Sequence, residues 1–390
     1  MTKIGTAQSS TQSGLQGMRA VFAGRQPEVT PVWFMRQAGR SLPEYRELRA
    51  GVPMLDACLN PEMAAEITVQ PVRRLGVDAG IFFSDIVVPL RLLGVDVEIV
   101  PGRGPVFASP IDDARGVASL VGREVTGVGD ASGGAFSVIT EAVQRAREML
   151  ATPGLNPETP DEPTPLLGFA SAPFTLASYL VEGGPSKDHL KTRAFMLAQP
   201  AAWTALARWC AQVSLEFLRA QVLGGVIGVQ VFDSWVGVLS RSQYRELVLP
   251  HTAAIFEGLS GAVTHDPAGF GAPLGTIHFG TGCHHLLQPM SQAGAALMGI
   301  DWRLDLSEAI ESLPGVGVQG NIDPALVVAA STSAQGASAL DEHVLGVLRA
   351  GRKSPVHILN LGHGVNPDTD PDVLAHIVRL AHRTRFEESR

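Results

Sequence analysis

The feature that most limits how this chain can fold is a series of eight short apolar runs, spread from residue 30 to residue 363. Stretches with helical periodicity lie between the runs. Apolar and polar residues do not alternate cleanly within a run, so we expect strands that are buried on both faces, as in parallel sheets. The runs comprise residues 30–35, 78–84, 165–171, 225–234, 275–280, 296–301, 316–322 and 355–363.

Eight strands alternating with helices predict an α/β protein, a single-domain (β/α)8 TIM barrel whose active site lies at the C-terminal ends of the strands. A doubly wound open sheet is the alternative that the pattern leaves open. No glycine-rich GxGxxG or GxxxxGK[ST] motif follows the first strand, which disfavours nucleotide-binding versions of that fold. The Ala/Leu-rich stretch 186–222 predicts a long helix between the fourth strand and its predecessor.

Capping residues mark two further helices. Asn60 followed by Pro61 is typical of a helix start, and Gly76 is typical of its end. Asp370 followed by Pro371 predicts the start of the last helix.

The domain organisation follows from length and local composition. We assign residues 18–390 to one barrel domain and expect residues 1–17, which are rich in Ser, Thr, Gln and Gly, to be disordered. These first residues resemble neither a secretory signal nor an Arg-rich transit peptide. A small extra hairpin is predicted within 86–100, and a surface insertion within about 101–165.

Charge and cysteine content restrict the partners and the compartment. The net charge of −8 disfavours nucleic acid and anionic membrane surfaces. Three widely spaced cysteines without a CxxC motif fit a reducing compartment, and no apolar run reaches the length of a membrane span. We therefore expect a cytoplasmic protein with a small-molecule partner. If that molecule is anionic, the protein must attract it locally.

A cluster of arginines follows the first apolar run. Arg36 and Arg40 flank the sequence Gln-Ala-Gly, and two more arginines follow before residue 50. The planar guanidinium binds carboxylates or phosphates through two bonds at a time, so this loop predicts an anion-binding site. The alternative is a solvated loop whose arginines pair with Glu44 and Glu47.

The ends of the other predicted strands provide further candidates, because all strand ends of a barrel meet at one face. Each candidate also has a structural interpretation. Asp85 could cap a helix, Tyr179 could be a ring at the core edge, Ser234 could cap the helix near residue 240, and His363 could be a structural histidine. The candidates are Ser84, Asp85, Tyr179, Glu182, Phe232, Asp233, Ser234, Asn360 and His363.

Residues 278–285, HFGTGCHH, contain metal-ligating residue types. Zinc sites require ligands at defined spacing, commonly with a second Cys or His pair downstream. Here the neighbouring Cys283, His284 and His285 would point in different directions, so we expect no metal site. The GxSxG and HExxH motifs are also absent.

Several segments, taken together, resemble the uroporphyrinogen decarboxylase family. They are PVWFMRQAGRSLPEYRELR, FFSDIVVPL, GFASAPFTLASYLVEGG, VQVFDSWVGVLS, GIDW, VQGNIDP and ILNLGHGVNPDTDP, in this order from about residue 20 onward. The resemblance implies a TIM-barrel lyase of porphyrin and heme biosynthesis, usually a homodimer. This carboxy-lyase removes CO2 from the four acetate side chains of uroporphyrinogen III, a tetrapyrrole, to give coproporphyrinogen III. It needs no metal or organic cofactor.

The resemblance also implies the site. Arg36 and Arg40 match the arginines that bind substrate carboxylates, with Gln37 in the same loop, and Asp85 matches the aspartate that accepts hydrogen bonds from the pyrrole N–H groups. Asp85, Arg36 and Tyr179 are the catalytic candidates. The substrate-binding candidates are Arg36, Gln37, Arg40, Asp85, Tyr179, Phe232, Ser234 and His363.

Two departures and two rival functions remain. Ser41 stands where the family commonly has Tyr, and Phe174 where Trp is usual; we expect neither to change the reaction.

One rival is a zinc- and corrinoid-dependent methyltransferase of the same superfamily, which needs an HxC pattern, whereas His278 here is followed by Phe and Gly. The other is a non-catalytic tetrapyrrole-binding protein, against which the intact set of site residues argues.

Overall fold

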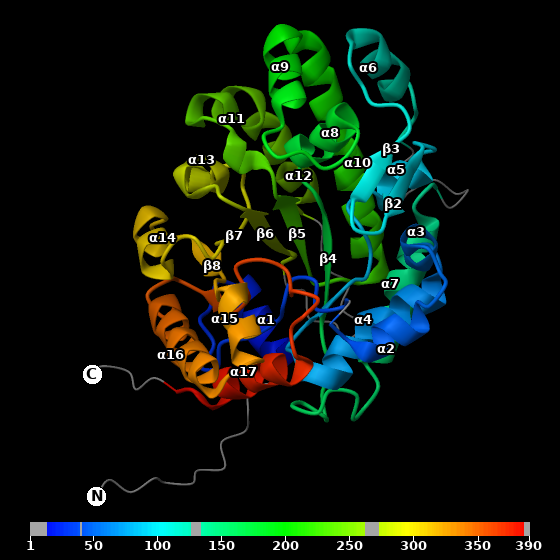
Figure 1. The fold of residues 1–390 in the computed structure, drawn as a ribbon. Helices are drawn as coiled ribbons and strands as arrows, with labels where there is room; N and C mark the ends of the chain where they lie inside the picture. The colour runs from blue at the N-terminus through cyan, green and yellow to red at the C-terminus, as the bar shows by residue number, and fades with distance from the viewer. Residues whose placement is uncertain (1–13, 40, 126–133, 262–272, 386–390) are drawn as a thin grey trace, which may run out of the picture.

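The computed structural model describes residues 14–39, 41–125, 134–261 and 273–385. Its central element is a sheet of seven parallel strands surrounded by helices (Figure 1). Each of the second to eighth predicted runs contains one of these strands. In sheet order they are β1 (Gly80–Ile81), β4 (Leu166–Ser171), β5 (Gly228–Asp233), β6 (Gly275–Gly280), β7 (Leu297–Gly299), β8 (Gly317–Gln319) and β9 (His357–Ile358).

The first apolar run closes this sheet into a barrel. Val32 forms a parallel bridge with Leu359, just beyond β9. On its other side, the Asp78 N–H donates to the Val32 carbonyl at 2.8 Å, and the Val32 N–H donates to the Asp78 carboxylate at 2.7 Å. Just before β1, the Asp78 carboxylate therefore accepts the hydrogen bond that a backbone carbonyl would accept between two paired strands. The predicted (β/α)8 TIM barrel is confirmed.

Two helix starts form as their capping residues predict. The Asn60 side chain accepts a hydrogen bond from the Met63 N–H at 3.0 Å, and Gly76 ends that helix in the left-handed conformation. The Asp370 side chain accepts from the Asp372 N–H at 2.9 Å. The stretch 186–222 forms two helices instead of one, because Pro200 lacks an N–H and begins the second.

The helices after residue 40, including those just described, surround the barrel or cover its upper end in Figure 1. They are α2 (Pro43–Leu48), α3 (Met54–Cys58), α4 (Pro61–Leu75), α5 (Val88–Leu92), α6 (Ala114–Val121), α7 (Ser137–Leu150), α8 (Pro173–Glu182), α9 (Leu190–Ala198), α10 (Pro200–Gly224), η1 (Val236–Val238), α11 (Arg241–Leu247), α12 (Leu249–Leu259), η2 (His284–Leu286), α13 (Leu287–Ser291), α14 (Leu306–Ser312), α15 (Pro324–Ala330), α16 (Ala334–Gly351) and α17 (Pro371–Arg383).

An N-terminal helix, α1 (Gly14–Phe22), covers the lower end of the barrel. Met18 and Phe22 are buried in one cluster with side chains from inside the barrel. The Phe22 ring lies so close to Gly228 and Gly275 that a Cβ there would be 2.7 Å and 2.3 Å from it. The prediction of disorder is therefore wrong for residues 14–17, because burying the apolar side chains that follow them orders this helix. Residues 1–13 lie outside the described ranges.

The predicted hairpin exists but lies further along the chain. It consists of β2 (Val97–Val100) and β3 (Gly104–Phe107), paired antiparallel, whereas the first part of the 86–100 segment forms α5. Residues 101–165 also contain more than a surface insertion. Their helix α7 packs between α4 and α10 as part of the ring around the barrel.

A chain of polar side chains crosses the barrel interior. The Trp33 Nε1–H donates to Gln319 at 3.0 Å, the Gln319 amide donates to Gln230 at 2.8 Å, and the Gln230 amide reaches the Met35 sulfur at 3.2 Å. These groups are buried and joined in series, which fixes their side-chain orientations beneath the strand ends. Within the described ranges, no helix is long and apolar enough to cross a membrane.

Candidate active site

The loop after the first strand turns sharply at Arg36. This residue adopts a φ of 60°, a left-handed conformation that is uncommon for a side chain other than glycine. Gln37 holds the turn in place, because its amide oxygen accepts from the Phe34 N–H at 2.9 Å and its amide nitrogen donates to the Ala79 carbonyl at 3.0 Å. Arg36 is thereby left exposed while Gln37 is fully buried. The geometry gives Gln37 a positioning role, and its contact with substrate stays a prediction.

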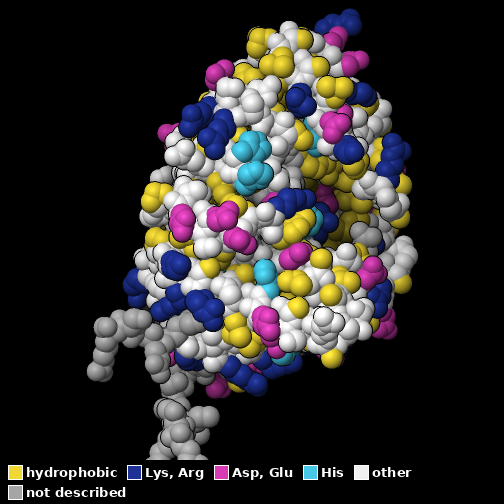
Figure 2. Space-filling model, turned by 60° about the vertical axis from the view of Figure 1, so that its left-hand side comes forward, with side chains coloured by type: hydrophobic (Ala, Val, Ile, Leu, Met, Phe, Trp, Pro, Cys, Tyr) yellow, Lys and Arg dark blue, Asp and Glu magenta, His cyan; other side chains and the backbone are white. Residues whose placement is uncertain are grey.

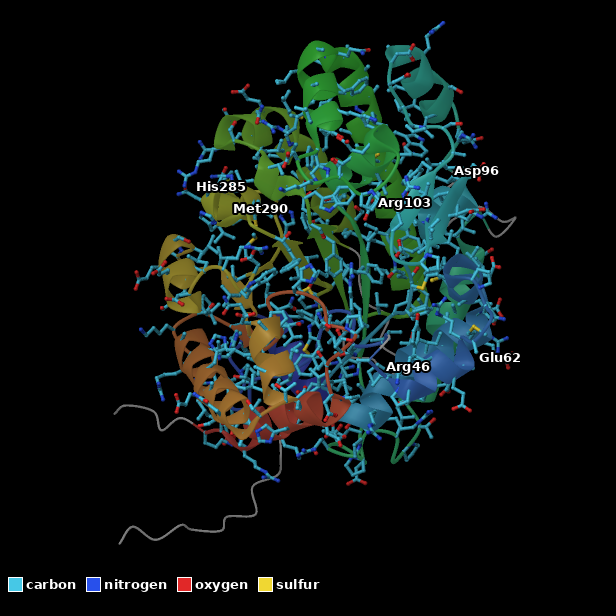
Figure 3. The ribbon with its side chains drawn as sticks, in the orientation of Figure 1. Arg46, Glu62, Asp96, Arg103, His285 and Met290 are labelled. Atoms are coloured by element: carbon cyan, nitrogen blue, oxygen red, sulfur yellow. The ribbon has the colours of Figure 1, made fainter. Side chains whose placement is uncertain are left out.

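The second arginine of this loop, Arg40, lies outside the described residues. Of the two arginines that follow, Arg49 serves local structure: it donates to the Val52 carbonyl at 3.1 Å, and its guanidinium lies 5.4 Å from the centre of the Tyr45 ring. Arg46 is exposed on α2, well below the strand ends (Figure 3).

The loop after β9 is tied to the Arg36 loop. The Asn360 amide oxygen accepts from the Met35 N–H at 3.0 Å, and the Val365 N–H donates to the Met35 carbonyl at 2.8 Å. Between these bonds, a Cβ on Gly364 would lie only 2.5 Å from the Arg36 Cδ. The glycine lets the Arg36 side chain lie directly against the backbone next to His363.

Asp85 follows β1 and is partly exposed. One carboxylate oxygen accepts from the Val87 N–H at 3.0 Å, so the side chain caps the turn that precedes α5. Burial raises the pKa of Asp85, although the Val87 N–H, the positive charge of Arg36 and the Ile86 N–H oppose this shift. Asp85 therefore caps this turn, and its side chain can still take part in the site.

Tyr179 lies on α8 between two aromatic rings. Its ring centroid is 4.0 Å from that of Trp235 and 6.2 Å from that of Phe107. Burial raises the pKa of Tyr179, the negative charge of Asp85 raises it further, and Arg36 opposes the shift. The phenol therefore stays protonated at neutral pH. The charges of Arg36 and Asp85 both act on Tyr179, so these three residues, far apart in sequence, lie near one another.

Phe232 and Ser234 flank a buried aspartate at the end of β5. The Phe232 ring is partly exposed and meets Phe169 edge-on, with centroids 5.6 Å apart. Between the two residues, Asp233 accepts from the Thr175 hydroxyl at 3.0 Å, which ties β5 to α8. Ser234 does not cap the following helix.

That helix, α11, is capped by Ser240 instead. The Ser240 side chain accepts from the Gln243 N–H at 3.2 Å, and the Gln243 side chain accepts from the Ser240 N–H at 3.0 Å. The side chain of Ser234 is therefore left at the strand ends.

His363 is partly buried beside Trp302, with the two ring centroids 5.6 Å apart. Burial lowers the pKa of His363, and the positive charges of Arg36 and Arg303 lower it further. The imidazole is therefore neutral at pH 7. It can donate one hydrogen bond and accept one.

The structure does not connect the remaining candidates, Glu182, Ser84 and the residues of the 278–285 segment, with the residues described above. Glu182 accepts from the N–H and hydroxyl of Thr192 at 2.9 and 3.0 Å, next to the start of α9. The Ser84 hydroxyl is buried and has no hydrogen-bond partner among the residues that the structure describes. Of the possible metal ligands, Cys283 is buried and His285 contacts the Leu239 carbonyl at 2.8 Å. Among the described residues, no three His, Cys, Asp or Glu side chains are grouped to hold a metal ion.

The molecule is hollowed where these loops meet. Figure 2 shows a hollow in the upper half of one face, lined by hydrophobic side chains, with Lys and Arg side chains at its edge. In Figure 3, Arg103 on the β2–β3 turn and His285 beside α13 lie on opposite sides of the strand ends. The upper half of the molecule thus offers a site with apolar surface and positive charge at its rim.

Our sequence interpretation missed four neighbours of the site. Trp235 and Trp302 lie within the segments FDSW and GIDW, so their motifs were a usable signal. Arg303 follows the second of these motifs directly. Phe107 comes from the β2–β3 hairpin, and only the tertiary structure places it beside Tyr179.

Comparisons with known proteins bear on this site. A family model described as uroporphyrinogen decarboxylase (URO-D) matches residues 15–384. Curated proteins of that name include one from Leifsonia xyli, 50% identical over 371 residues, and one from Saccharopolyspora erythraea, 48% identical over 373 residues. Each alignment covers 93% of this chain and 93% of the relative.

Among solved structures, a methyltransferase from Methanosarcina mazei superposes with a TM-score of 0.72, covering 95% of this chain and 98% of its own. The identity is 17%, so this likeness concerns the fold alone.

Proposed function

The chain belongs to the uroporphyrinogen decarboxylase family, and on that premise we propose that Arg36, Asp85 and Tyr179 carry the reaction. The protein is a carboxy-lyase that decarboxylates uroporphyrinogen, within porphyrin and heme biosynthesis. The finer proposal is that it removes all four acetate carboxylates of uroporphyrinogen III to give coproporphyrinogen III, and that it does so without a metal or organic cofactor.

The chemistry requires an electron sink, because direct loss of CO2 from an acetate arm would leave a carbanion. Protonation of the adjacent pyrrole carbon makes that ring cationic. The bond between the arm's methylene and its carboxylate then breaks, CO2 leaves, and the electron pair moves toward the ring. A second proton adds to the methylene to form a methyl group, and the ring proton is lost. Each arm thus exchanges CO2 for one proton.

Asp85 is proposed to stabilise the cationic ring. An ionised carboxylate facing the pyrrole N–H groups acts as a preorganised negative charge where positive charge develops. In the free protein, burial raises its pKa, so the charged form is held at a cost. The pyrrole N–H donors and Arg36 favour the charged form when substrate is bound.

Arg36 and Arg40 are proposed to hold the substrate's carboxylates, and Tyr179 to donate a hydrogen bond. An arginine and a phenol with a raised pKa are both weak acids at neutral pH. We therefore propose that neither side chain is the source of the ring proton, and that water held in the site relays it from bulk solvent. The further substrate-binding residues proposed are Gln37, Phe232, Ser234 and His363, of which Phe232 supplies apolar surface for the macrocycle.

We also propose that the enzyme is a homodimer in the cytoplasm. On α9, Leu190 is 68% exposed and Leu197 is 59% exposed, and a second copy of the chain could cover these apolar side chains. The three cysteines are buried and unpaired, which fits a reducing compartment. Light scattering should give twice the mass of one chain; a monomer at micromolar concentration would contradict the dimer.

The observation that supports the catalytic proposal is the proximity of Arg36 and Asp85, which follow the first strand and β1, to each other and to Tyr179 on α8. The test is Asp85→Asn, assayed with uroporphyrinogen in the dark under reducing conditions by counting carboxyl groups on the product. We expect turnover to fall at least about a hundredfold. Because burial disfavours the charged form, the neutral amide should leave the melting temperature unchanged or higher.

Asp161→Asn, at an exposed position in the loop before β4, is the matched control and should retain full activity. Near wild-type turnover in Asp85→Ala would refute the role of the carboxylate. Intact substrate after incubation with the wild-type protein would instead favour a binding protein.

A further inference from the structure

The loop after β7 carries an arginine in a rigid setting. The guanidinium carbon of Arg303 lies 3.8 Å from the centre of the Trp302 ring, and its Nη1 lies 3.0 Å from an Asp301 carboxylate oxygen. The Arg303 side chain is nevertheless 47% exposed. Stacking and the ion pair therefore hold a guanidinium that still faces solvent.

Asp301 is itself fixed by several donors. Its side chain is 6% exposed and accepts hydrogen bonds from the Gly282 N–H, the Arg303 N–H at 2.9 Å, and the Arg303 guanidinium. Within the described part of the chain, Asp301 takes one of the five N–H donors of Arg303. The aspartate thus orients the guanidinium and leaves much of its planar fork for another anion.

Two glycines place this loop against the site. A Cβ on Gly362 would lie 2.3 Å from the Trp302 backbone nitrogen, and a Cβ on Gly364 would lie 2.5 Å from the Arg36 Cδ. His363 lies between them, and the positive charges of both Arg36 and Arg303 act on its imidazole. The Gly-His-Gly segment is therefore held between the Arg36 loop and the loop that carries Arg303.

We propose that Arg303 is a further substrate-binding residue, which binds a peripheral carboxylate of the substrate on the opposite side of His363 from Arg36. The inference rests on the proposed function. The substrate's carboxylates are spread around the whole macrocycle, so a single arginine loop cannot reach them all. A protein with a net charge of −8 must supply local positive charge at more than one point. A preoriented guanidinium loses little conformational freedom when it binds.

The alternative is that Arg303 only completes a surface ion pair with Asp301. The chain contains a matched control, Arg73, which pairs with Glu66 at 2.8 Å and is 49% exposed. Arg73 lies in the last turn of α4, which leads into the lower end of the barrel before β1. The variants Arg303→Gln and Arg73→Gln remove the same charge from similarly exposed arginines, although Asp301 is 6% exposed and Glu66 is 33% exposed.

We expect Arg303→Gln to raise KM for uroporphyrinogen about tenfold while kcat stays within about twofold, because a charge-assisted hydrogen bond to the substrate is lost. Arg73→Gln should change neither constant. Arg303→Lys keeps the charge but not the fork, and should give an intermediate KM. If Arg303→Gln proves less stable on thermal unfolding, the Lys variant takes its place in the comparison.

An unchanged KM in the stable Arg303 variant, or an equal rise in Arg73→Gln, would overturn the inference. Either result would concern Arg303 alone. The proposed function would still stand if the wild type decarboxylates uroporphyrinogen and Asp85→Asn does not. A wild-type protein without decarboxylase activity would remove the proposed function itself.

Discussion

Burial and the positive charge of Arg36 both act on the titratable residues of the site. Burial raises the pKa of Asp85, whereas Arg36 lowers it, and the same guanidinium also lowers the pKa of His363. Arg36 adopts its exposed position because Gln37 holds the turn from inside and Gly364 leaves room beside it. One side chain therefore acts on three titratable neighbours, since Arg36 also opposes the raised pKa of Tyr179.

This arrangement predicts a shift in the pH dependence of Arg36→Gln. Without the guanidinium, the pKa of Asp85 rises further, so the carboxylate becomes protonated at a higher pH on acidification. The acid limb of the kcat/KM profile should therefore move to higher pH, in addition to a general loss of substrate affinity.

Arg145→Gln is the control for this profile. Arg145 forms an exposed i,i+4 pair with Glu141 on the outer helix α7, and its loss should leave the profile unchanged. An acid limb of Arg36→Gln that coincides with that of the wild type would contradict the coupling.

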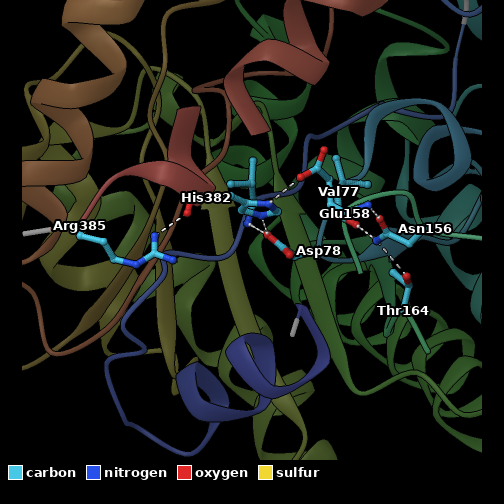
Figure 4. Close-up of polar contacts among 8 residues, drawn as sticks. Val77, Asp78, Asn156, Glu158, Thr164, His382 and Arg385 are labelled. Carbon is cyan, nitrogen blue, oxygen red and sulfur yellow. Dashed lines mark hydrogen bonds and ion pairs between the residues drawn. The ribbon is translucent and has the colours of Figure 1, made fainter. Parts of the chain in front are cut away.

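At the scale of elements, the junction of the first strand, β1 and α17 closes the barrel. Asp78 accepts from the Val32 N–H at 2.7 Å and contacts His382 on α17 at 2.8 Å, and Glu158 lies 3.7 Å from the other nitrogen of His382 (Figure 4). Burial by itself lowers the pKa of His382, but the charges and hydrogen bonds of Asp78 and Glu158 outweigh it and raise the pKa to about 10.

The folded state therefore holds the His382 proton more tightly than the unfolded chain, whose histidine has a pKa near 6.5. This contribution to stability, of the order of 5 kcal/mol, is complete below about pH 6.5 and is lost as the pH rises through about 10. His382→Gln should lower the melting temperature by several degrees at pH 7, and the difference from the wild type should disappear near pH 10.

His376→Gln is a matched control on the same helix. His376 pairs with Asp341 at 2.7 Å, but the two side chains are 47% and 40% exposed. Such an exposed pair contributes less than about 1 kcal/mol, so the melting temperature should hardly change. A difference between His382→Gln and the wild type that stays constant up to pH 10 would show that packing, and not the proton, provides the stability.

At the scale of the whole molecule, the barrel brings loops from the entire chain to one face. The same fold occurs in the methyltransferase from Methanosarcina mazei at 17% identity, so the architecture alone does not decide the reaction. We propose that the residues at the strand ends decide it. In this protein they offer an arginine, a carboxylate, a phenol and apolar rings.

The proposed reaction uses the protonated pyrrole as its electron sink and assigns no step to a metal ion. We therefore expect enzyme dialysed against a chelator to keep its decarboxylation rate, with less than one zinc ion per chain by elemental analysis. Stoichiometric zinc, together with activity that a chelator abolishes and zinc restores, would contradict this proposal.

The sequence alone determined which segments form strands and where two helices begin. These features depend on local chemistry: apolar runs that need burial on both faces, and side chains such as Asn60 and Asp370 that cap the N–H groups beside them. The arginine loop and the other site candidates could also be proposed from the sequence, because strand ends converge in any barrel, and their roles stay predictions.

Only the tertiary structure decided what each of these residues touches. Three contacts join segments that are far apart in sequence. The Asp78 side chain takes part in the strand ladder, α1 packs into the lower end of the barrel, and Arg303 comes near His363. No periodicity or cap encodes such contacts. They arise because closing the barrel forces distant loops to share one small volume, where close packing and charge determine which side chains meet.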